Sequence, residues 1–153
     1  MDKAVTRYIQ MKTVILSILF ILPLTQGCGF VYQRHLTGNY YLIAVDSKDD
    51  MDVCYHPQRG DAPYTGITGA SVYAAGYDND FILVKAYPAL KDRTGISLHR
   101  YDSSTTEYYI IPVNNTQEAW EAQESKFGPF GKEDFEVKRR ELGVPDNITF
   151  KEL

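Results

Sequence analysis

The stretch ASVYAAGYDNDFILVKAY, residues 70–87, decides the fold. Two strand-forming apolar runs, 70–77 and 81–87, are separated only by Asp78, Asn79 and Asp80. Asp and Asn side chains hydrogen-bond to their own backbone and tolerate the left-handed conformation that tight turns use. The stretch therefore predicts an antiparallel β-hairpin.

Further strand-forming runs lie on both sides of this hairpin. Tyr40–Val45 is followed by an acidic turn, after which Val53–His56 is placed to pair back with it. Ile96–Tyr101 and Tyr108–Val113 flank a polar turn of six residues and predict a second hairpin. Some runs, such as 81–84, are apolar at every position, so we expect strands that are covered on both faces.

The C-terminal third supplies the expected cover. Asn115 is a candidate N-cap with Glu118 three residues on, and apolar residues that include Trp120 and Phe127 follow at helical spacing. Gly128 to Gly131 then interrupts the chain. A second helix is predicted from about Lys132 to Leu142, because Gly143 and Pro145 are stop signals.

These patterns predict an α+β domain over residues 39–153, strand-rich over 39–113 and mainly helical over 114–153. Its expected architecture is one antiparallel sheet of about five or six strands with two C-terminal helices packed on it. A β-sandwich with peripheral helices is the alternative.

The N-terminal segment has the features of a secretory leader. The apolar run Val14–Leu24 is shorter than the roughly 20 residues that a membrane-spanning helix needs. Basic residues precede it, as the positive-inside rule expects. Translation from either Met1 or Met11 gives a leader of this type.

The run Leu24-Thr25-Gln26-Gly27-Cys28 resembles the lipobox of bacterial lipoprotein precursors. The resemblance implies that residues 1–27 are a lipoprotein signal peptide cleaved between Gly27 and Cys28. It also implies that acyl chains, palmitate among them, anchor Cys28 to a membrane of the bacterial cell envelope, on the periplasmic or outer face. Residues 28–38 are then expected to form a lipid-anchored tether. Whether the inner or the outer membrane holds the anchor stays open.

The rest of the chain resembles small bacterial lipoproteins of uncharacterised function. The stretches that carry this resemblance are residues 72–88, 108–113 and 135–150. They contain no catalytic signature, so the resemblance implies a localisation and a fold but no site residues.

Charge and cysteine content narrow the function classes. Three of the 16 basic and one of the 20 acidic residues lie in the leader, which leaves 13 basic and 19 acidic residues, a net charge of about −6. This balance disfavours nucleic acid as a partner. With Cys28 acylated, Cys54 has no disulfide partner and is expected to be a buried strand residue.

Candidate chemistry is sparse. Cys54 and His56 form one pair of possible metal ligands, whereas zinc sites show more pairs, so we expect no metal site. The acidic residues 46–52 lack the order of an EF-hand loop and are expected to be a solvated turn. We also expect no cofactor, and no phosphate-binding loop is present. No nucleophile elbow surrounds any serine.

Tyrosine is the remaining anomaly, with 12 in the chain. Exposed Tyr side chains are suited to binding surfaces, and the loop that carries Arg59, Asp61 and Tyr64 is the first candidate. We expect a non-enzymatic module that binds an envelope protein or a cell-wall component, with an inhibitor or immunity protein as a narrower version. The alternative is an envelope hydrolase that uses His56 or His99 with an Asp.

Overall fold

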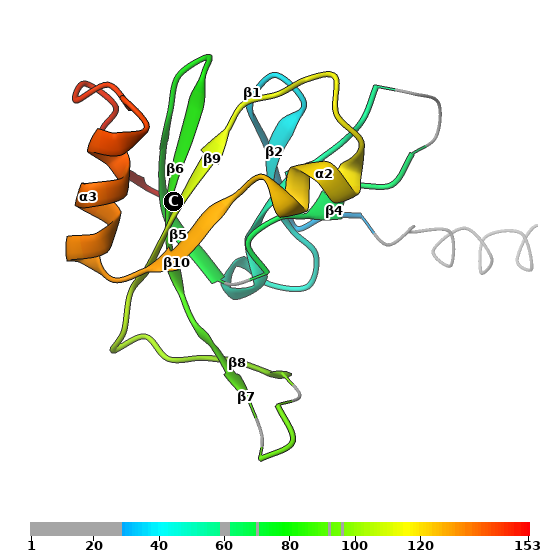
Figure 1. The fold of residues 1–153 in the computed structure, drawn as a ribbon. Helices are drawn as coiled ribbons and strands as arrows, with labels where there is room; N and C mark the ends of the chain where they lie inside the picture. The colour runs from blue at the N-terminus through cyan, green and yellow to red at the C-terminus, as the bar shows by residue number, and fades with distance from the viewer. Residues whose placement is uncertain (1–28, 59–61, 70, 92, 96) are drawn as a thin grey trace, which may run out of the picture.

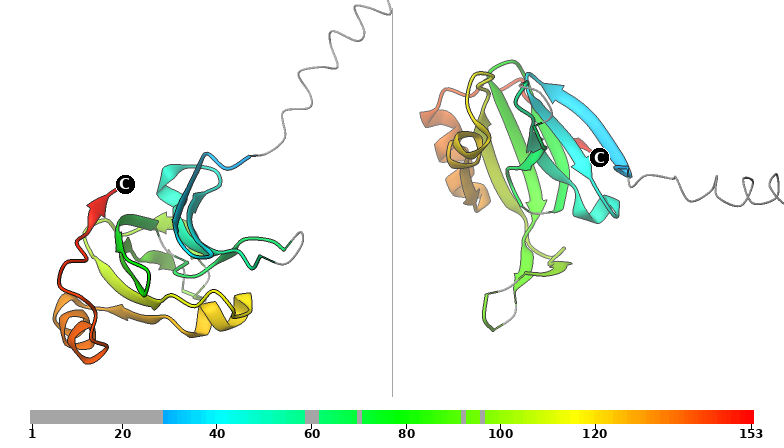
Figure 2. Two further views of the ribbon diagram at one scale, coloured as in Figure 1. Left: turned by 90° about the horizontal axis from the view of Figure 1, so that it is seen from above. Right: turned by 90° about the vertical axis from the view of Figure 1, so that its right-hand side faces the viewer.

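The two larger antiparallel sheets of the described residues face each other, as the views of the chain show (Figure 1, Figure 2). The structure is a computed structural model that describes residues 29–58, 62–69, 71–91, 93–95 and 97–153. Among these residues the sheets have four, five and two strands, and the smallest sheet is a hairpin that protrudes from the other two (Figure 1).

The four-stranded sheet has its strands in sequence order. A short 3-10 helix, η2 (Lys48–Asp50), connects the second strand to the third. The strands are β1 (Tyr32–Thr37), β2 (Tyr40–Ala44), β3 (Asp52–Tyr55) and β4 (Thr65–Gly66).

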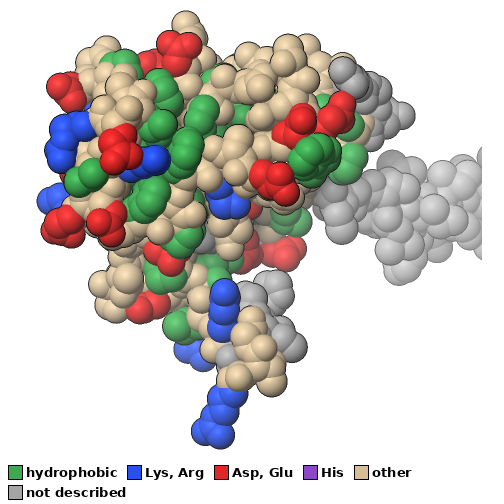
Figure 3. All heavy atoms as spheres, in the orientation of Figure 1, with side chains coloured by type: hydrophobic (Ala, Val, Ile, Leu, Met, Phe, Trp, Pro, Cys, Tyr) green, Lys and Arg blue, Asp and Glu red, His purple; other side chains and the backbone are tan. Residues whose placement is uncertain are grey.

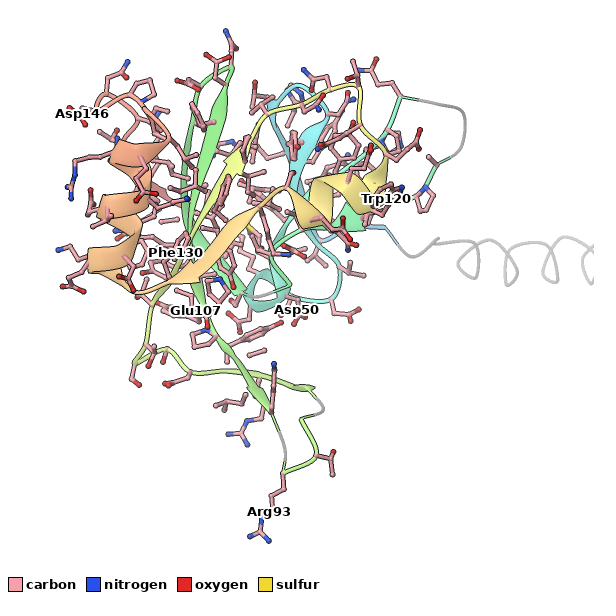
Figure 4. The ribbon with its side chains drawn as sticks, viewed as in Figure 1. Asp50, Arg93, Glu107, Trp120, Phe130 and Asp146 are labelled. Carbon is pink, nitrogen blue, oxygen red and sulfur yellow. The ribbon has the colours of Figure 1, made fainter. Side chains whose placement is uncertain are left out.

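The five-stranded sheet is built on the hairpin quoted above, and its strand order is β10-β9-β6-β5-β11. Its strands are β5 (Ser71–Tyr77), β6 (Phe81–Tyr87), β9 (Glu107–Pro112), β10 (Phe127–Phe130) and β11 (Lys151–Glu152). The protruding hairpin consists of β7 (Ala89–Lys91) and β8 (Ser97–Tyr101). Lys and Arg side chains stand at its tip (Figure 3), where Arg93 is labelled in Figure 4.

The β5–β6 hairpin is confirmed, and its turn has the expected chemistry. The Asp78 carboxylate accepts hydrogen bonds from the backbone N–H groups of Asp80 and Phe81, both at 2.8 Å. These bonds satisfy donors that the ladder leaves unpaired at the turn.

The expected cover on both faces of the strands is also confirmed. Alternate residues of β6 point to opposite sides, so Ile82 and Val84 join the core between the two sheets, whereas Leu83 joins a second core on the far face. Helix α3 (Lys132–Glu141) lies over that far face and inserts Phe135, which is fully buried (Figure 1). The five-stranded sheet is therefore the middle layer of the domain.

The arrangement of the sheets differs from the single sheet that the sequence predicted. The fold is α+β, but the strands divide into two sheets that bury their inner faces against each other. Tyr40, Leu42 and Tyr55 from the four-stranded sheet meet Ile82 and Ile111 from the five-stranded sheet in one core. This arrangement is closer to the alternative architecture, a β-sandwich with peripheral helices.

The second predicted hairpin is wrong. β8 and β9 do not pair; β8 pairs with β7, and β9 pairs with β6 over six positions from Phe81 opposite Pro112 to Ala86 opposite Glu107. Pairing with β6 places Ile110 and Ile111 in the two cores on either side of the sheet, burial that a small surface hairpin would not provide.

The helical region is only partly as predicted. Helix α2 is shorter and later than expected, spanning Ala119–Glu124, with Glu118 and Glu121 forming its capping box. Trp120 on this helix (Figure 4) is 59% exposed, and Phe127 belongs to β10. The boundary of α3, by contrast, agrees closely with the prediction.

The expected tether over residues 28–38 is also corrected. Residues 32–37 form β1, which pairs with β2 from Tyr32 opposite Ala44 to Thr37 opposite Tyr40. Leu36 of this strand is buried, and Tyr32 packs against the core. The domain therefore begins within the segment that was assigned to the tether, while Cys28 itself lies outside the described residues.

Candidate binding surface

The outer face of the four-stranded sheet gathers aromatic and histidine side chains. Directly paired residues of neighbouring strands point to the same side, so the pairing of Tyr41 with His35 and with Cys54 places all three on this face. His56 follows β3 and lies on the same side, with its ring centroid 6.4 Å from that of Tyr41. Its backbone N–H donates to the Asn39 carbonyl at 2.9 Å, which fixes where the strand ends.

Tyr64 folds onto this face from the loop that precedes β4. Its ring lies 4.4 Å from the ring of His56 and 5.3 Å from that of Tyr41, and its hydroxyl accepts a hydrogen bond from Gln33 at 2.8 Å. His35 completes the group, with its ring 5.0 Å from that of Tyr41. We call His35, Tyr41, His56 and Tyr64 the aromatic–histidine surface.

The aromatic–histidine surface combines ring faces with hydrogen-bonding groups. His35 is exposed, and the other three side chains are half-buried. The rings of Tyr41 and Tyr64 meet nearly perpendicularly, at 88°, a packing that holds them in place while leaving edges and hydroxyls accessible. One nitrogen of His35 lies 2.8 Å from the Gly38 carbonyl, so that contact orients the imidazole. Such a surface is suited to stacking and hydrogen bonding with a ligand.

Cys54 lies beneath this surface as a structural residue. It is 7% exposed. Burial, and to a smaller extent the charge of Asp52, raises the pKa of its thiol to about 12. Because the thiolate is the reactive form, this environment makes Cys54 a poor nucleophile and a poor metal ligand.

A buried polar network supports one end of the surface. The Asn39 backbone N–H and side-chain amide donate to the side chain and the carbonyl of Asn115, each at 2.9 Å. The Tyr55 hydroxyl donates to the Gln117 carbonyl at 2.9 Å, and the Gln117 amide donates to the Tyr40 hydroxyl at 2.6 Å. These bonds tie the β1–β2 turn to the segment that follows β9. The backbone beside His56 is therefore held from both sheets.

Asp52 fixes the other flank, where β4 joins the sheet. Its carboxylate accepts hydrogen bonds from the backbone N–H and hydroxyl of Thr68 and from the backbone N–H of Gly69. Burial raises the pKa of this carboxyl, and the three hydrogen bonds oppose that effect. We interpret Asp52 as a support for the loop rather than as an acid or base.

A cleft lies at the base of the protruding hairpin. It is a cleft of about 690 Å³ between the acidic turn that contains Asp46, Asp49 and Asp50 and the hairpin residues Arg100 and Tyr101. The Tyr101 hydroxyl donates to Asp50 at 3.3 Å (Asp50 is labelled in Figure 4), and its pKa is raised by burial and by the acidic neighbours. No group of three or more His, Cys, Asp or Glu side chains among the described residues is placed to hold a metal ion.

The candidate site residues proposed from the sequence differ in where the structure places them. Tyr64 lies on the aromatic–histidine surface, whereas Arg59 and Asp61 of the same loop lie outside the described residues, as do Gly27 and Cys28. His56 contacts the rings of Tyr41 and Tyr64, and within the described part of the chain it has no ion pair or hydrogen bond with a carboxylate.

The other proposed histidine, His99, has a side chain outside the described set. The sequence did not lead us to place His35, Tyr41 and Gln33 together on one surface. The period-two alternation of β1 and β2, combined with their register, was the signal that could have found them.

The fold defines a class of protein: a small α+β domain of two facing antiparallel sheets with a helix over the outer face of the larger sheet. Comparison with protein families then shows that residues 37–153 match the family described as "Protein of unknown function (DUF3997)", and the chain belongs to this family. The match begins at the end of β1, so it does not include Cys28.

The other comparisons add no relative. No curated protein and no solved structure matches the chain. Among the residues that the structure describes, no helix is long and apolar enough to cross a membrane.

Proposed function

We propose that this protein is a lipid-anchored binding module of the bacterial cell envelope and that its ligand binds at the aromatic–histidine surface. The observation that carries the proposal is the ring cluster of Tyr41, His56 and Tyr64, which come from β2, from the end of β3 and from the loop before β4 and have centroid distances of 4.4–6.4 Å. Supported from below by buried hydrogen bonds, this cluster is a preorganised surface, and preorganisation lowers the entropic cost of binding.

The proposed anchor rests on the sequence. The run Val14–Leu24 is followed by Leu24-Thr25-Gln26-Gly27-Cys28, so processing would leave Cys28 as the acylated first residue. Several acyl chains, at about 0.8 kcal/mol for each buried methylene, hold a protein on a membrane durably. Anchoring in this way keeps the binding surface close to the envelope throughout the life of the protein.

The chemistry of the surface favours a glycan of the cell wall as the ligand. Tyr and His offer ring faces and hydrogen-bonding groups, with no Lys, Arg, Asp or Glu among the four side chains, and Gln33 adds an exposed amide beside Tyr64. Sugar rings present both C–H faces and hydroxyl groups, which match this combination. A strongly charged protein partner would require opposite charges that these side chains do not carry.

Anchoring is tested by growing cells with an alkyne-labelled fatty acid. The wild-type protein should incorporate the label, and the Cys28→Ala variant should not. Equal incorporation by the two proteins would show that Cys28 is not the attachment point.

Binding is tested by sedimenting the full-length protein, solubilised in detergent, with purified cell-wall sacculi. We expect the Tyr41→Ala/Tyr64→Ala variant to lose at least about tenfold in affinity, because two stacking side chains are removed. Tyr73→Ala is the matched control, since Tyr73 packs on Tyr87 at 4.3 Å in the other sheet.

Equal sedimentation of all three proteins would contradict the assignment of the surface. If sacculi do not bind the wild-type protein, but a photocrosslinker in place of Tyr64 captures one envelope protein, then the ligand is a protein rather than a glycan.

A further inference from the structure

Three exposed apolar side chains gather where the described chain begins. Phe30, Val31 and Val45 are 42%, 56% and 54% exposed, and they make up half of the six exposed large hydrophobic residues in the described part of the chain. The Val31 backbone N–H donates to the Ala44 carbonyl at 3.0 Å, which places Val31 beside Val45 across the ends of β1 and β2. We call these three residues the anchor-proximal edge.

Chain length ties this edge to the proposed lipid. Cys28 precedes Val31 by three residues, so even a fully extended chain keeps their Cα atoms within roughly 11 Å of each other. Since Val31 is already hydrogen-bonded to the sheet, no long linker separates the folded domain from the anchor. Figure 2 shows that β1 begins at the rim of the fold, where neither helix covers it.

We propose that, in the anchored protein, the anchor-proximal edge lies on the lipid bilayer, with Phe30, Val31 and Val45 in contact with the boundary between headgroups and acyl chains. This inference rests on the lipidation of Cys28 proposed above. Exposed apolar side chains beside an anchor gain free energy by leaving water, in proportion to the apolar area that the bilayer covers. The domain is therefore held in one orientation rather than tumbling on its lipid.

The orientation also places the binding surface. The Phe30 ring meets the Tyr64 ring edge-to-face at 5.4 Å, so Tyr64 stands next to the membrane-seated residue. Tyr side chains are favoured at the level of the headgroups because the ring is apolar and the hydroxyl is polar. The aromatic–histidine surface then extends from the headgroups into the space next to the membrane.

Charge near the edge determines which lipids suit it. Asp46 follows Val45 directly, and Asp49 and Asp50 lie in the same turn. Lys48, the basic residue of this turn, has its ammonium group over the Tyr32 ring, 5.3 Å from the ring centroid. Anionic headgroups repel such a turn. Contact of the anchor-proximal edge with the bilayer is therefore driven by its apolar side chains. The edge should lie closer to a neutral bilayer than to an anionic one.

The test uses the full-length, processed lipoprotein in vesicles of phosphatidylcholine that contains a nitroxide-labelled lipid. An environment-sensitive fluorophore is attached to Val45→Cys or, in a separate protein, to Val137→Cys. Val137 is 47% exposed on α3 and serves as the matched control. Asp46→Cys is a third reporter that leaves all three apolar side chains in place.

We expect several-fold stronger quenching at positions 45 and 46 than at position 137, and weaker quenching at both when phosphatidylglycerol is added to the vesicles. Equal quenching at the three positions, in protein whose acylation at Cys28 is confirmed by mass spectrometry, would overturn the orientation while leaving the anchor intact. Absence of acyl chains on Cys28 would overturn the anchor and this inference together.

Discussion

The carboxylate of Asp52 holds the backbone N–H of Thr68 at 2.9 Å, and this contact joins β3 to the loop after β4. The same carboxylate accepts from the Thr68 hydroxyl and from the Gly69 N–H at 3.1 Å. Gly66 pairs with Cys54 across the β3–β4 ladder, and a Cβ on Gly66 would collide with the Asp52 carboxylate. One partly buried side chain thus determines the shape of the turn at residues 66–69.

Replacing Asp52 with Ala should destabilise the domain by about 2–4 kcal/mol, because three donors lose a buried acceptor. Asp46→Ala is the control, since Asp46 is exposed in the acidic turn and its loss should change the free energy of unfolding by less than about 0.5 kcal/mol. Urea unfolding followed by circular dichroism measures both. Equal midpoints for the two variants would show that the Asp52 contacts contribute nothing.

Asp52 should also make stability depend on pH. Burial raises its pKa above the ordinary value of 3.8, so the folded protein binds the proton more tightly than the unfolded chain does. Its contribution to stability is fully present below pH 3.8 and is lost as the pH rises through the folded pKa. The free energy of unfolding of the wild type minus that of Asp52→Asn should therefore fall as the pH rises above 3.8 and through the folded pKa. A difference that rises over this range contradicts the assignment.

Gly38 in the β1–β2 turn should not tolerate a side chain. Its φ is +54°, and a Cβ there would collide with the side chain of Asn115. Gly38→Ala should cost more than the roughly 1 kcal/mol expected of Gly143→Ala, where φ is +67° and no atom lies within 4 Å. Gly131→Ala has neither constraint. Thermal unfolding should rank the three variants in this order, and a Gly38→Ala protein as stable as Gly131→Ala would refute the close approach.

Cys54 should be inert in the folded protein. Its thiol is buried and its pKa is raised to about 12, so the thiolate is scarce at neutral pH. In a protein that carries Cys28→Ala, a water-soluble maleimide should react with Cys54 at least about tenfold more slowly than with the exposed thiol introduced by Val137→Cys. Addition of urea should remove the difference. Rapid labelling of Cys54 in native protein would show that the outer face of the four-stranded sheet opens.

Local patterns predicted the hairpins whose turns carry their own signal. The β5–β6 turn has Asp78, and the two strands around η2 flank an acidic run, so both pairings are adjacent in sequence. The pairing of β6 with β9 brings together residues 21 to 31 positions apart. The sequence of neither strand indicates which strand it pairs with, because any apolar run can fill a core position. Long-range pairing decides whether the strands form one sheet or two. For this reason the sequence led to the incorrect prediction of a single sheet.

The binding surface was only partly predictable for the same reason. Tyr64 was chosen because it lies in a loop, whereas Tyr41 has the pattern of an ordinary strand residue and His35 lies in the segment predicted to be a tether. Their common face appears only when β1 is paired with β2, in a segment that resembled a tether. The polar network beneath, with Asn39 bound to Asn115, joins positions 76 apart and has no sequence signature.

Trp120 and Phe135 offer the sharpest contrast between helical spacing and observed burial. Helical spacing predicts Trp120 as a core residue, but it is 59% exposed on α2, whereas Phe135 on α3 is fully buried beneath Tyr108 and Phe150. Phe135→Ala should therefore cost about 3–5 kcal/mol through the cavity it leaves.

Trp120→Ala should change stability by less than about 0.5 kcal/mol, since its ring already contacts water. Urea unfolding measures both, and Phe135→Leu, which keeps most of the volume, serves where the Ala variant does not fold. If Trp120→Ala destabilises the domain as much as Phe135→Leu does, then α2 contributes to the core after all, and the assignment of α3 as the principal helical cover is wrong.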